Sequence, residues 1–247
     1  LKKVKRKLSS KQIINKFKFI YHNQKLDTRN KSHLLEIFNI IEDAAFDLIN
    51  ILQEILVDFN IKCVITGGYA ISLHSNKNYK TTDIDIKLCP LRGFVQYQNA
   101  ISDIRNIVYE ILQFAGIYTT TSPPLLVFGT YRAGGDNNDG TIPIKIKIPK
   151  LVKNKTIYLE FIDITFSSFL KDNYRPTIDE LLCEENYRKK IKFYNFENNI
   201  QEKSFYMMGK VNLKKNLKEN LLPQLNDPNS KYRHKEESWK EQLINLE

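Results

Sequence analysis

The sequence predicts an α/β fold, α+β in a stricter scheme, in which a mixed β-sheet carries its helices on one side. Three observations lead to this prediction. Residues 33–59 carry apolar side chains at helical spacing, residues 61–66 form a short β-branched run, and residues 141–149 and 156–166 alternate apolar with polar side chains. The chain has 247 residues, of which 42% are hydrophobic, so it is long enough to bury a substantial core.

The first half of the middle region, residues 33–170, begins with a long helix over residues 33–59, because its apolar stripe is broad and continuous. Residues 61–66 (IKCVIT) then read as a buried strand. The pair Gly67–Gly68 ends this strand, and residues 70–76 (AISLHSN) form a short helix. Residues 82–90 (TDIDIKLCP) are predicted to be a second strand that ends at a proline.

The second half of this region continues with an amphipathic helix over residues 95–115. Residues 125–132 (LLVFGTYR) follow as a strand, and residues 133–141 (AGGDNNDGT) have the composition of a turn. Residues 141–149 (TIPIKIKIP) and 156–166 (TIYLEFIDITF) both alternate, so we expect them to pair as a hairpin.

The two ends of the chain differ from this middle part. Residues 1–32 are basic with interleaved aromatic side chains, which fits an arm on nucleic acid or, as we favour, a surface helix that packs its aromatics inward. After this middle region (33–170), residues 171–247 are predicted to be mainly helical, with helices over 177–190 and 203–222.

The formal net charge of +10 indicates a polyanionic partner such as nucleic acid or a nucleotide phosphate. The same abundance of Lys, Asn and Ile is also typical of an AT-rich genome, so the charge alone leaves the partner open. Cys63, Cys89 and Cys183 are widely spaced and form no metal-binding pair, which favours a reducing compartment. With no apolar run of membrane-spanning length and no signal-peptide pattern, we expect a cytoplasmic protein without a membrane partner.

The chemistry of the chain is concentrated in the Asp-Ile-Asp-Ile sequence of residues 83–86. Residues two apart on a strand point to the same face, so Asp83 and Asp85 project together while Ile84 and Ile86 enter the core. Two adjacent carboxylates raise each other's pKa unless a cation lies between them. A hard divalent ion, which prefers carboxylate and phosphate oxygens, fits this pair.

A third carboxylate is expected from the strand over residues 156–166. Asp163 alternates there with apolar neighbours, and strand register favours it over the competitors Glu160, Asp172 and Asp136. Three converging carboxylates are what a two-metal site for phosphoryl transfer requires. The Gly67–Gly68 turn at a helix start would offer backbone N–H groups to triphosphate oxygens.

This order of motifs resembles the nucleotidyltransferase superfamily of the DNA polymerase β type. Gly-Gly is followed by Asp-apolar-Asp-apolar and by a third carboxylate on a later strand, and the resemblance covers about residues 60–168. The spacer between the two motifs is slightly longer than is usual for the superfamily. The resemblance implies a fold of that type with residues 33–170 as the catalytic domain. It also implies two Mg²⁺ or Mn²⁺ ions on Asp83, Asp85 and Asp163, and a nucleoside triphosphate held by Gly67, Gly68 and Ser72.

The resemblance defines transfer of a nucleotide but does not name the molecule that accepts it. The stretch NKNYKTTDID and the long preceding helix are similar to the catalytic region of viral poly(A) polymerases of the poxvirus and giant-virus kind. That similarity implies mRNA processing, with AMP transferred from ATP to an RNA 3′ end in the host cytoplasm or virion. It leaves open whether the chain forms a homodimer or needs a partner subunit.

Two alternatives remain beside this interpretation. One is a nucleotidyltransferase that modifies a small molecule, tRNA or a protein, as in toxin–antitoxin systems, whose GG-x-A…DID pattern is also similar. The other is a non-catalytic RNA-binding subunit that keeps the fold, which the intact Asp83 and Asp85 argue against.

Several further residues have a functional and an ordinary interpretation. Ser72 could contact phosphate or lie on a solvated helix face, and His74 is better explained as a helix-end residue than as a base. A lysine cluster at helical spacing could follow an RNA backbone or form a solvated helix face. Its members are Lys210, Lys214, Lys215 and Lys218.

Overall fold

The computed structural model describes residues 30–59, 61–75, 79–90, 126–128, 132–133, 140–152, 155–166, 188–195 and 199–247. The predicted N-terminal arm up to residue 29, the predicted helix over residues 95–115 and the turn residues 134–139 lie outside this part of the chain. The described strands are β1 (Ile61–Thr66), β2 (Ile84–Pro90), β3 (Leu126–Phe128), β4 (Arg132–Ala133), β5 (Gly140–Val152), β6 (Lys155–Phe166), β7 (Arg188–Tyr194) and β8 (Ile200–Met207).

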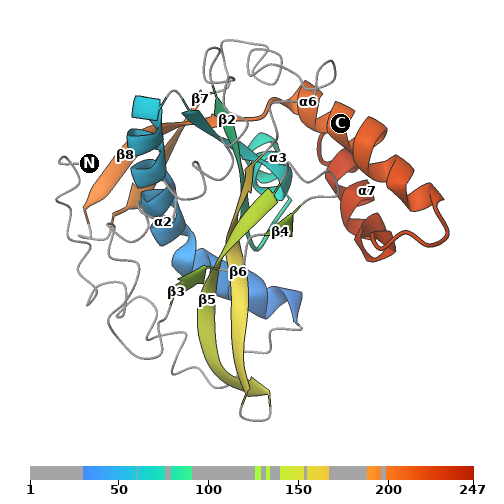
Figure 1. Ribbon diagram of the computed structural model, residues 1–247, viewed down its shortest axis with the longest axis horizontal. Coiled ribbons are helices and arrows are strands. Elements are labelled where there is room, and N and C mark those ends of the chain that lie inside the picture. The colour runs from blue at the N-terminus through green and yellow to red at the C-terminus, as the bar shows by residue number, and fades with distance from the viewer. Residues whose placement is uncertain are drawn as a thin grey trace.

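These strands form one mixed sheet in the order β3-β5-β6-β2-β1-β8-β7, with β4 paired to β5 (Figure 1). Strand β1 runs antiparallel to β2 and parallel to β8. Strand β2 runs parallel to β6, which forms the predicted antiparallel hairpin with β5. The mixed sheet with helices packed on it confirms the predicted fold class.

Helix α2 (Lys31–Leu56) confirms the long helix predicted from the apolar stripe. The side chain of Asn30 caps its first turn by accepting a hydrogen bond of 2.9 Å from the backbone N–H of Ser32. A 3₁₀ turn, η1 (Val57–Phe59), ends the helix. The ring of Phe46 contacts those of Phe193 and Phe205 on β7 and β8, so α2 covers one face of the sheet.

The central strands direct their apolar side chains to this covered face. Ile86 pairs with Ile65 on β1 and with Ile164 on β6, and all three side chains are buried. Helix α3 (Gly67–His74) lies on the same side, since the ring of Tyr69 packs edge-on against Phe46. The predicted short helix is thus confirmed, although it begins at the glycine pair itself.

The sequence prediction fails at residues 188–207. The helices predicted over 177–190 and 203–222 are wrong for residues 188–190 and 203–207, which belong to the antiparallel strands β7 and β8. In β7 the basic side chains alternate with Ile191 and Phe193, a strand pattern that the high charge concealed. This hairpin extends the same sheet beyond β1.

Helical structure resumes at α6 (Lys210–Lys215) and continues through a π-helical segment, η2 (Asn216–Leu221). The short turns η3 (Leu222–Asn226) and η4 (Arg233–Lys235) lead to α7 (Glu236–Ile244). The residues Leu213, Leu217 and Trp239 are buried and join this C-terminal segment to the main core. No helix in the described residues is long and apolar enough to span a membrane.

Candidate active site

Three acidic residues meet on the face of the sheet opposite α2. Asp85 on β2 pairs with Asp163 on the parallel strand β6 and with Thr66 on β1. Side chains of paired residues project to the same face of a sheet, so the two carboxylates are immediate neighbours. The register thereby selects Asp163 as the neighbour of Asp85.

Asp83 lies directly before β2, two positions from Asp85. Its Oδ1 atom accepts a hydrogen bond of 2.7 Å from the hydroxyl of Thr81. Asp83 and Asp85 are partly exposed, whereas Ile84 and Ile86 are buried on the opposite face. The alternation expected from the sequence is therefore present.

The glycine pair at the start of α3 lies against this carboxylate row. Gly67 has a φ of 59°, in the left-handed region that favours glycine. A Cβ atom at this position would collide with the Oδ2 atom of Asp85, so the absence of a side chain allows the close approach. The backbone N–H of Gly68 donates a hydrogen bond to Asp85, which links the start of the helix to the carboxylate.

The electrostatics of Asp85 reflect this crowding. Burial, followed by the negative charges of Asp83 and Asp163, raises the pKa of the Asp85 carboxyl to about 7. The hydrogen bond from Gly68 and the positive charge of Lys235 oppose this rise in the pKa. A proton or a cation is therefore needed at the site near neutral pH to offset the repulsion between the carboxylates.

The donor set fits a hard divalent cation, because it consists of carboxylates whose mutual repulsion a cation would relieve. Within the described part of the chain, no three acidic, His or Cys side chains are already arranged as a ligand cluster. Asp83 and Asp85 are instead held by Thr81 and Gly68. Metal binding would therefore exchange these hydrogen bonds for coordination.

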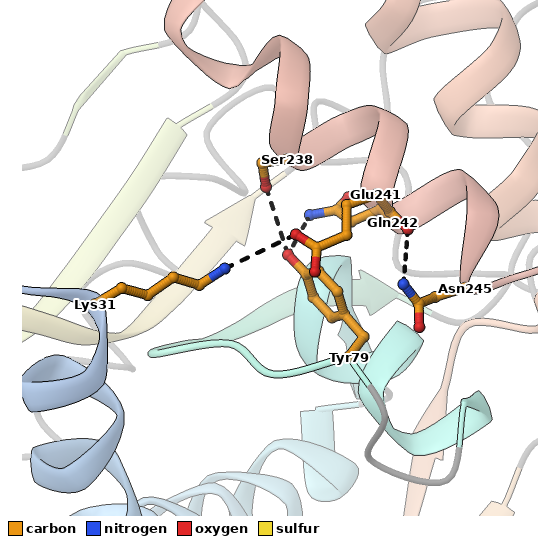
Figure 2. Close-up of polar contacts among 6 residues, drawn as sticks. All are labelled: Lys31, Tyr79, Ser238, Glu241, Gln242 and Asn245. Carbon is orange, nitrogen blue, oxygen red and sulfur yellow. Dashed lines mark hydrogen bonds and ion pairs between the residues drawn. The ribbon is translucent and has the colours of Figure 1, made fainter.

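The C-terminal segment contributes a part of the site that the sequence did not reveal. Tyr79 lies just before the carboxylate motif, and its hydroxyl contacts Ser238 at 3.4 Å and Gln242 at 3.0 Å on α7 (Figure 2). Lys235 immediately precedes α7, and its charge acts on Asp85. A lone lysine in a polar stretch carries no sequence signal of such a role.

The same contact extends to the start of α2. Figure 2 shows Lys31 reaching Glu241, with 3.8 Å between Nζ and Oε2. The side chain of Asn245 donates a 2.8 Å hydrogen bond to the backbone carbonyl of Glu241. Helix α7 thus contacts both the loop before β2 and the first turn of α2.

The remaining predicted residues on α3 have ordinary roles or stay predictions. Ser72 shares a helix face with Gly68 but is buried, so the solvated-face explanation is wrong and its contact with phosphate stays a prediction. His74 is the last residue of α3, as expected, and its Nε2 atom lies 3.0 Å from the carbonyl oxygen of Met208. Burial lowers the pKa of His74, and the charges of Lys189 and Lys210 act in the same direction.

The predicted lysine cluster lies on α6 and η2, in which Leu213 and Leu217 are buried. Lys210, Lys215 and Lys218 are exposed, and Lys214 is partly buried. Their contact with RNA stays a prediction. Of the competitors to Asp163, Glu160 lies before the residues of β6 that pair with β2, so it is not the partner of Asp85. Asp136 and Asp172 lie outside the described residues.

Comparisons with known proteins find similarity among solved structures. No protein-family model matches the chain, and no curated protein matches it. A solved structure, an antigenic nucleotidyltransferase-like protein from Paracoccidioides brasiliensis, is similar with a TM-score of 0.36 and 16% sequence identity. The match covers 82% of this chain and 76% of that one. The functional assignment therefore rests on the geometry of the carboxylate site.

Proposed function

We propose that this protein is a metal-dependent nucleotidyltransferase that adds nucleotides, AMP from ATP, to the 3′ end of RNA. The observation that carries the proposal is the pairing of Asp85 with Asp163 across parallel strands, directly beside the glycine turn of α3. Asp83 completes the acidic set from the residue before β2. This arrangement suits metal-assisted transfer of a phosphoryl-linked group, because it gathers only carboxylate ligands, which hard divalent cations prefer.

In the proposed reaction, the acceptor hydroxyl oxygen forms a bond to the α-phosphorus, and the bond from this phosphorus to the pyrophosphate oxygen breaks. Asp83, Asp85 and Asp163 would hold Mg²⁺ or Mn²⁺, which activates the hydroxyl and neutralises charge on the phosphates when bound. Asp163 pairs with Asp85 on the neighbouring strand. It would face the RNA 3′ hydroxyl and accept the proton of this hydroxyl.

The triphosphate would lie at the start of α3. Gly67 and Gly68 present backbone N–H groups at a helix N-terminus, and the missing side chains let phosphate oxygens come close. Lys235, whose charge already acts on Asp85, would balance the negative charge of the leaving pyrophosphate.

The test is incubation of the purified protein with a labelled oligo(A) RNA primer, Mg²⁺ or Mn²⁺, and each of the four nucleoside triphosphates separately. We expect extension with ATP alone. Asp83→Asn and Asp163→Asn should each lower the rate by at least about 1000-fold, equivalent to about 4 kcal/mol of activation free energy. Glu54→Gln is the matched control, because it neutralises a carboxylate on α2, on the opposite face of the sheet from the acidic row.

Near-normal extension by either aspartate variant would refute the mechanism. If no triphosphate extends RNA, transfer of labelled AMP to tRNA, protein or a small molecule distinguishes the toxin-like alternative. Tight RNA binding without metal-dependent transfer to any acceptor would instead support a non-catalytic subunit.

A further inference from the structure

A second charged surface lies on the same face of the sheet as the carboxylates. It comprises Lys62 on β1, Tyr206 on β8, and Arg188, Lys190 and Lys192 on β7, and is called the cationic strand surface below. Tyr206 pairs with Val64 on one side and with Arg188 on the other. Since Val64 and Lys62 are in phase with Thr66, the partner of Asp85, all of these side chains project to the carboxylate face.

The centre of this surface is the ring of Tyr206, which gathers two cations. The Nζ atom of Lys62 lies 4.8 Å from the ring centroid, and the Cζ atom of Arg188 lies 4.6 Å from it. Arg188 also donates a hydrogen bond to the Tyr206 hydroxyl. Strand β8 lies between β1 and β7, so the cations approach from opposite neighbouring strands. Cation–π contacts thus hold two positive charges beside one aromatic ring.

Strand β7, at the edge of the sheet, adds further positive charge to this surface. Arg188, Lys190 and Lys192 are exposed, whereas Phe193 on the other face is buried. Glu202 is the ion-pair partner of both lysines, at 3.7 Å from Lys190 and 3.6 Å from Lys192. One carboxylate thus serves two ammonium groups, and such exposed pairs are weak enough to exchange for phosphate contacts.

The position of the cationic strand surface relative to the carboxylates indicates how a bound polyanion would run. Tyr206 pairs with Val64 on β1, and Thr66, two residues further along β1, pairs with Asp85 on β2. Two strand spacings and two residues along a strand separate Tyr206 from Asp85 by roughly 12 Å. A polyanion bound at Tyr206, Lys62 and Arg188 would therefore be a short distance from the acidic row. Repulsion by the acidic row and attraction by the cations would favour a strand that reaches the carboxylates only with its end.

We propose that the cationic strand surface binds the phosphate backbone of a single-stranded RNA whose 3′ end lies at the carboxylate row. This inference rests on the proposed function, since it names the place where the acceptor of that reaction is held. Lys62 and Arg188 would each contact one phosphate beside the ring of Tyr206, and Lys190 and Lys192 would contact phosphates further from the 3′ end. Contacts to phosphate alone would bind RNA with little base preference.

The test is the affinity of the full chain for a fluorescein-labelled oligo(A) RNA, measured by fluorescence anisotropy over a series of salt concentrations. The double variant Lys62→Gln, Arg188→Gln should bind roughly 10-fold more weakly. The slope of log affinity against log salt should become shallower by about 1.4, as expected for the loss of two phosphate contacts on a single strand. The matched control is Lys203→Gln on β8, whose side chain pairs with Glu54 of α2 at 3.2 Å on the opposite face.

A second double variant keeps the result unambiguous. Lys190→Gln, Lys192→Gln changes only exposed side chains on β7 and should weaken binding with a similar change in salt slope, even if the first variant folds poorly. Unchanged RNA affinity in both double variants, or an equal loss in Lys203→Gln, would overturn the inference.

The outcome is separable from that of the proposed function, because binding is measured without turnover. If the wild-type protein extends RNA but the variants bind RNA normally, the inference alone fails. If the variants lose RNA binding but the wild-type protein transfers no nucleotide to any acceptor, the surface stands and the proposed function fails.

Discussion

The two faces of strand β2 differ sharply although they share one backbone. On the face toward α2, Ile84 and Ile86 are 0% exposed and pack into the core. On the other face, Asp83 and Asp85 are partly exposed and repel each other. Because a strand alternates its side chains, the fold and the proposed chemistry depend on different residues of the same segment. Substitutions on one face should therefore affect stability, and substitutions on the other should affect activity.

The largest expected effect on stability is on the apolar face. Ile86→Ala removes a buried side chain between β1 and β6 and should lower the free energy of unfolding by about 2–5 kcal/mol. Chemical denaturation measures this loss. Activity per folded molecule should change little, and a large loss of activity at full folding would contradict the separation of the two faces.

The next effect is at the glycine turn that supports the acidic face. Gly67→Ala places a side chain in a left-handed conformation and against Asp85, so it should destabilise the fold by about 1–2 kcal/mol and displace the carboxylate. Denaturation and a transfer assay measure the two consequences. Gly68→Ala is the comparison. Its Cβ would lie 3.0 Å from the hydroxyl oxygen of Thr81, a side-chain atom that a small shift can move away. Equal effects of the two substitutions would count against a special role of Gly67.

A smaller effect concerns the dependence of stability on pH. The pKa of Asp85 is raised to about 7 in the fold, so the folded state binds more protons than the unfolded chain between the two pKa values. Without metal, the contribution of Asp85 to stability should be present at low pH and lost as the pH rises through 7. Thermal melting at a series of pH values measures this trend.

Asp85→Asn should remove that part of the pH dependence and raise the melting temperature of the metal-free protein at about pH 8. The amide keeps an oxygen that can accept the hydrogen bond from Gly68. The same variant should lose any stabilisation by Mg²⁺. A wild-type melting temperature that rises from pH 5 to pH 8, with no such trend in the variant, would contradict the assignment.

The smallest effect is expected where α7 meets the site. Tyr79→Phe removes the hydroxyl that contacts Ser238 and Gln242 and should cost about 1 kcal/mol of stability. The KM for the nucleoside triphosphate should rise, because the positive charge of Lys235, in the turn directly before α7, acts on Asp85. Tyr232→Phe, in a ring that packs on Trp239, is the control. An unchanged KM in Tyr79→Phe would show that this contact is only structural.

Much of the fold and of the acidic site was predictable because it follows from local periodicity. The apolar stripe of α2 and the alternation around Asp85 and Asp163 each depend on residues close in the sequence. The hairpin of β7 and β8 was not predicted, because the many charged residues concealed the alternation of apolar and polar side chains. Packing of Phe193 and Phe205 against Phe46 of α2, which the sequence does not show, stabilises the two strands. Tertiary packing overrides weak local preference in such segments.

The sequence by itself therefore determined the acidic residues, the glycine turn and the strands that carry them, because side-chain alternation is a property of the strand alone. Only the tertiary structure decided which strands lie beside one another. It brought Asp163 beside Asp85, Lys235 near the same carboxylate, and Lys62 and Arg188 to the ring of Tyr206. Those contacts join residues far apart in the chain, and their pairing depends on which surfaces can be buried together.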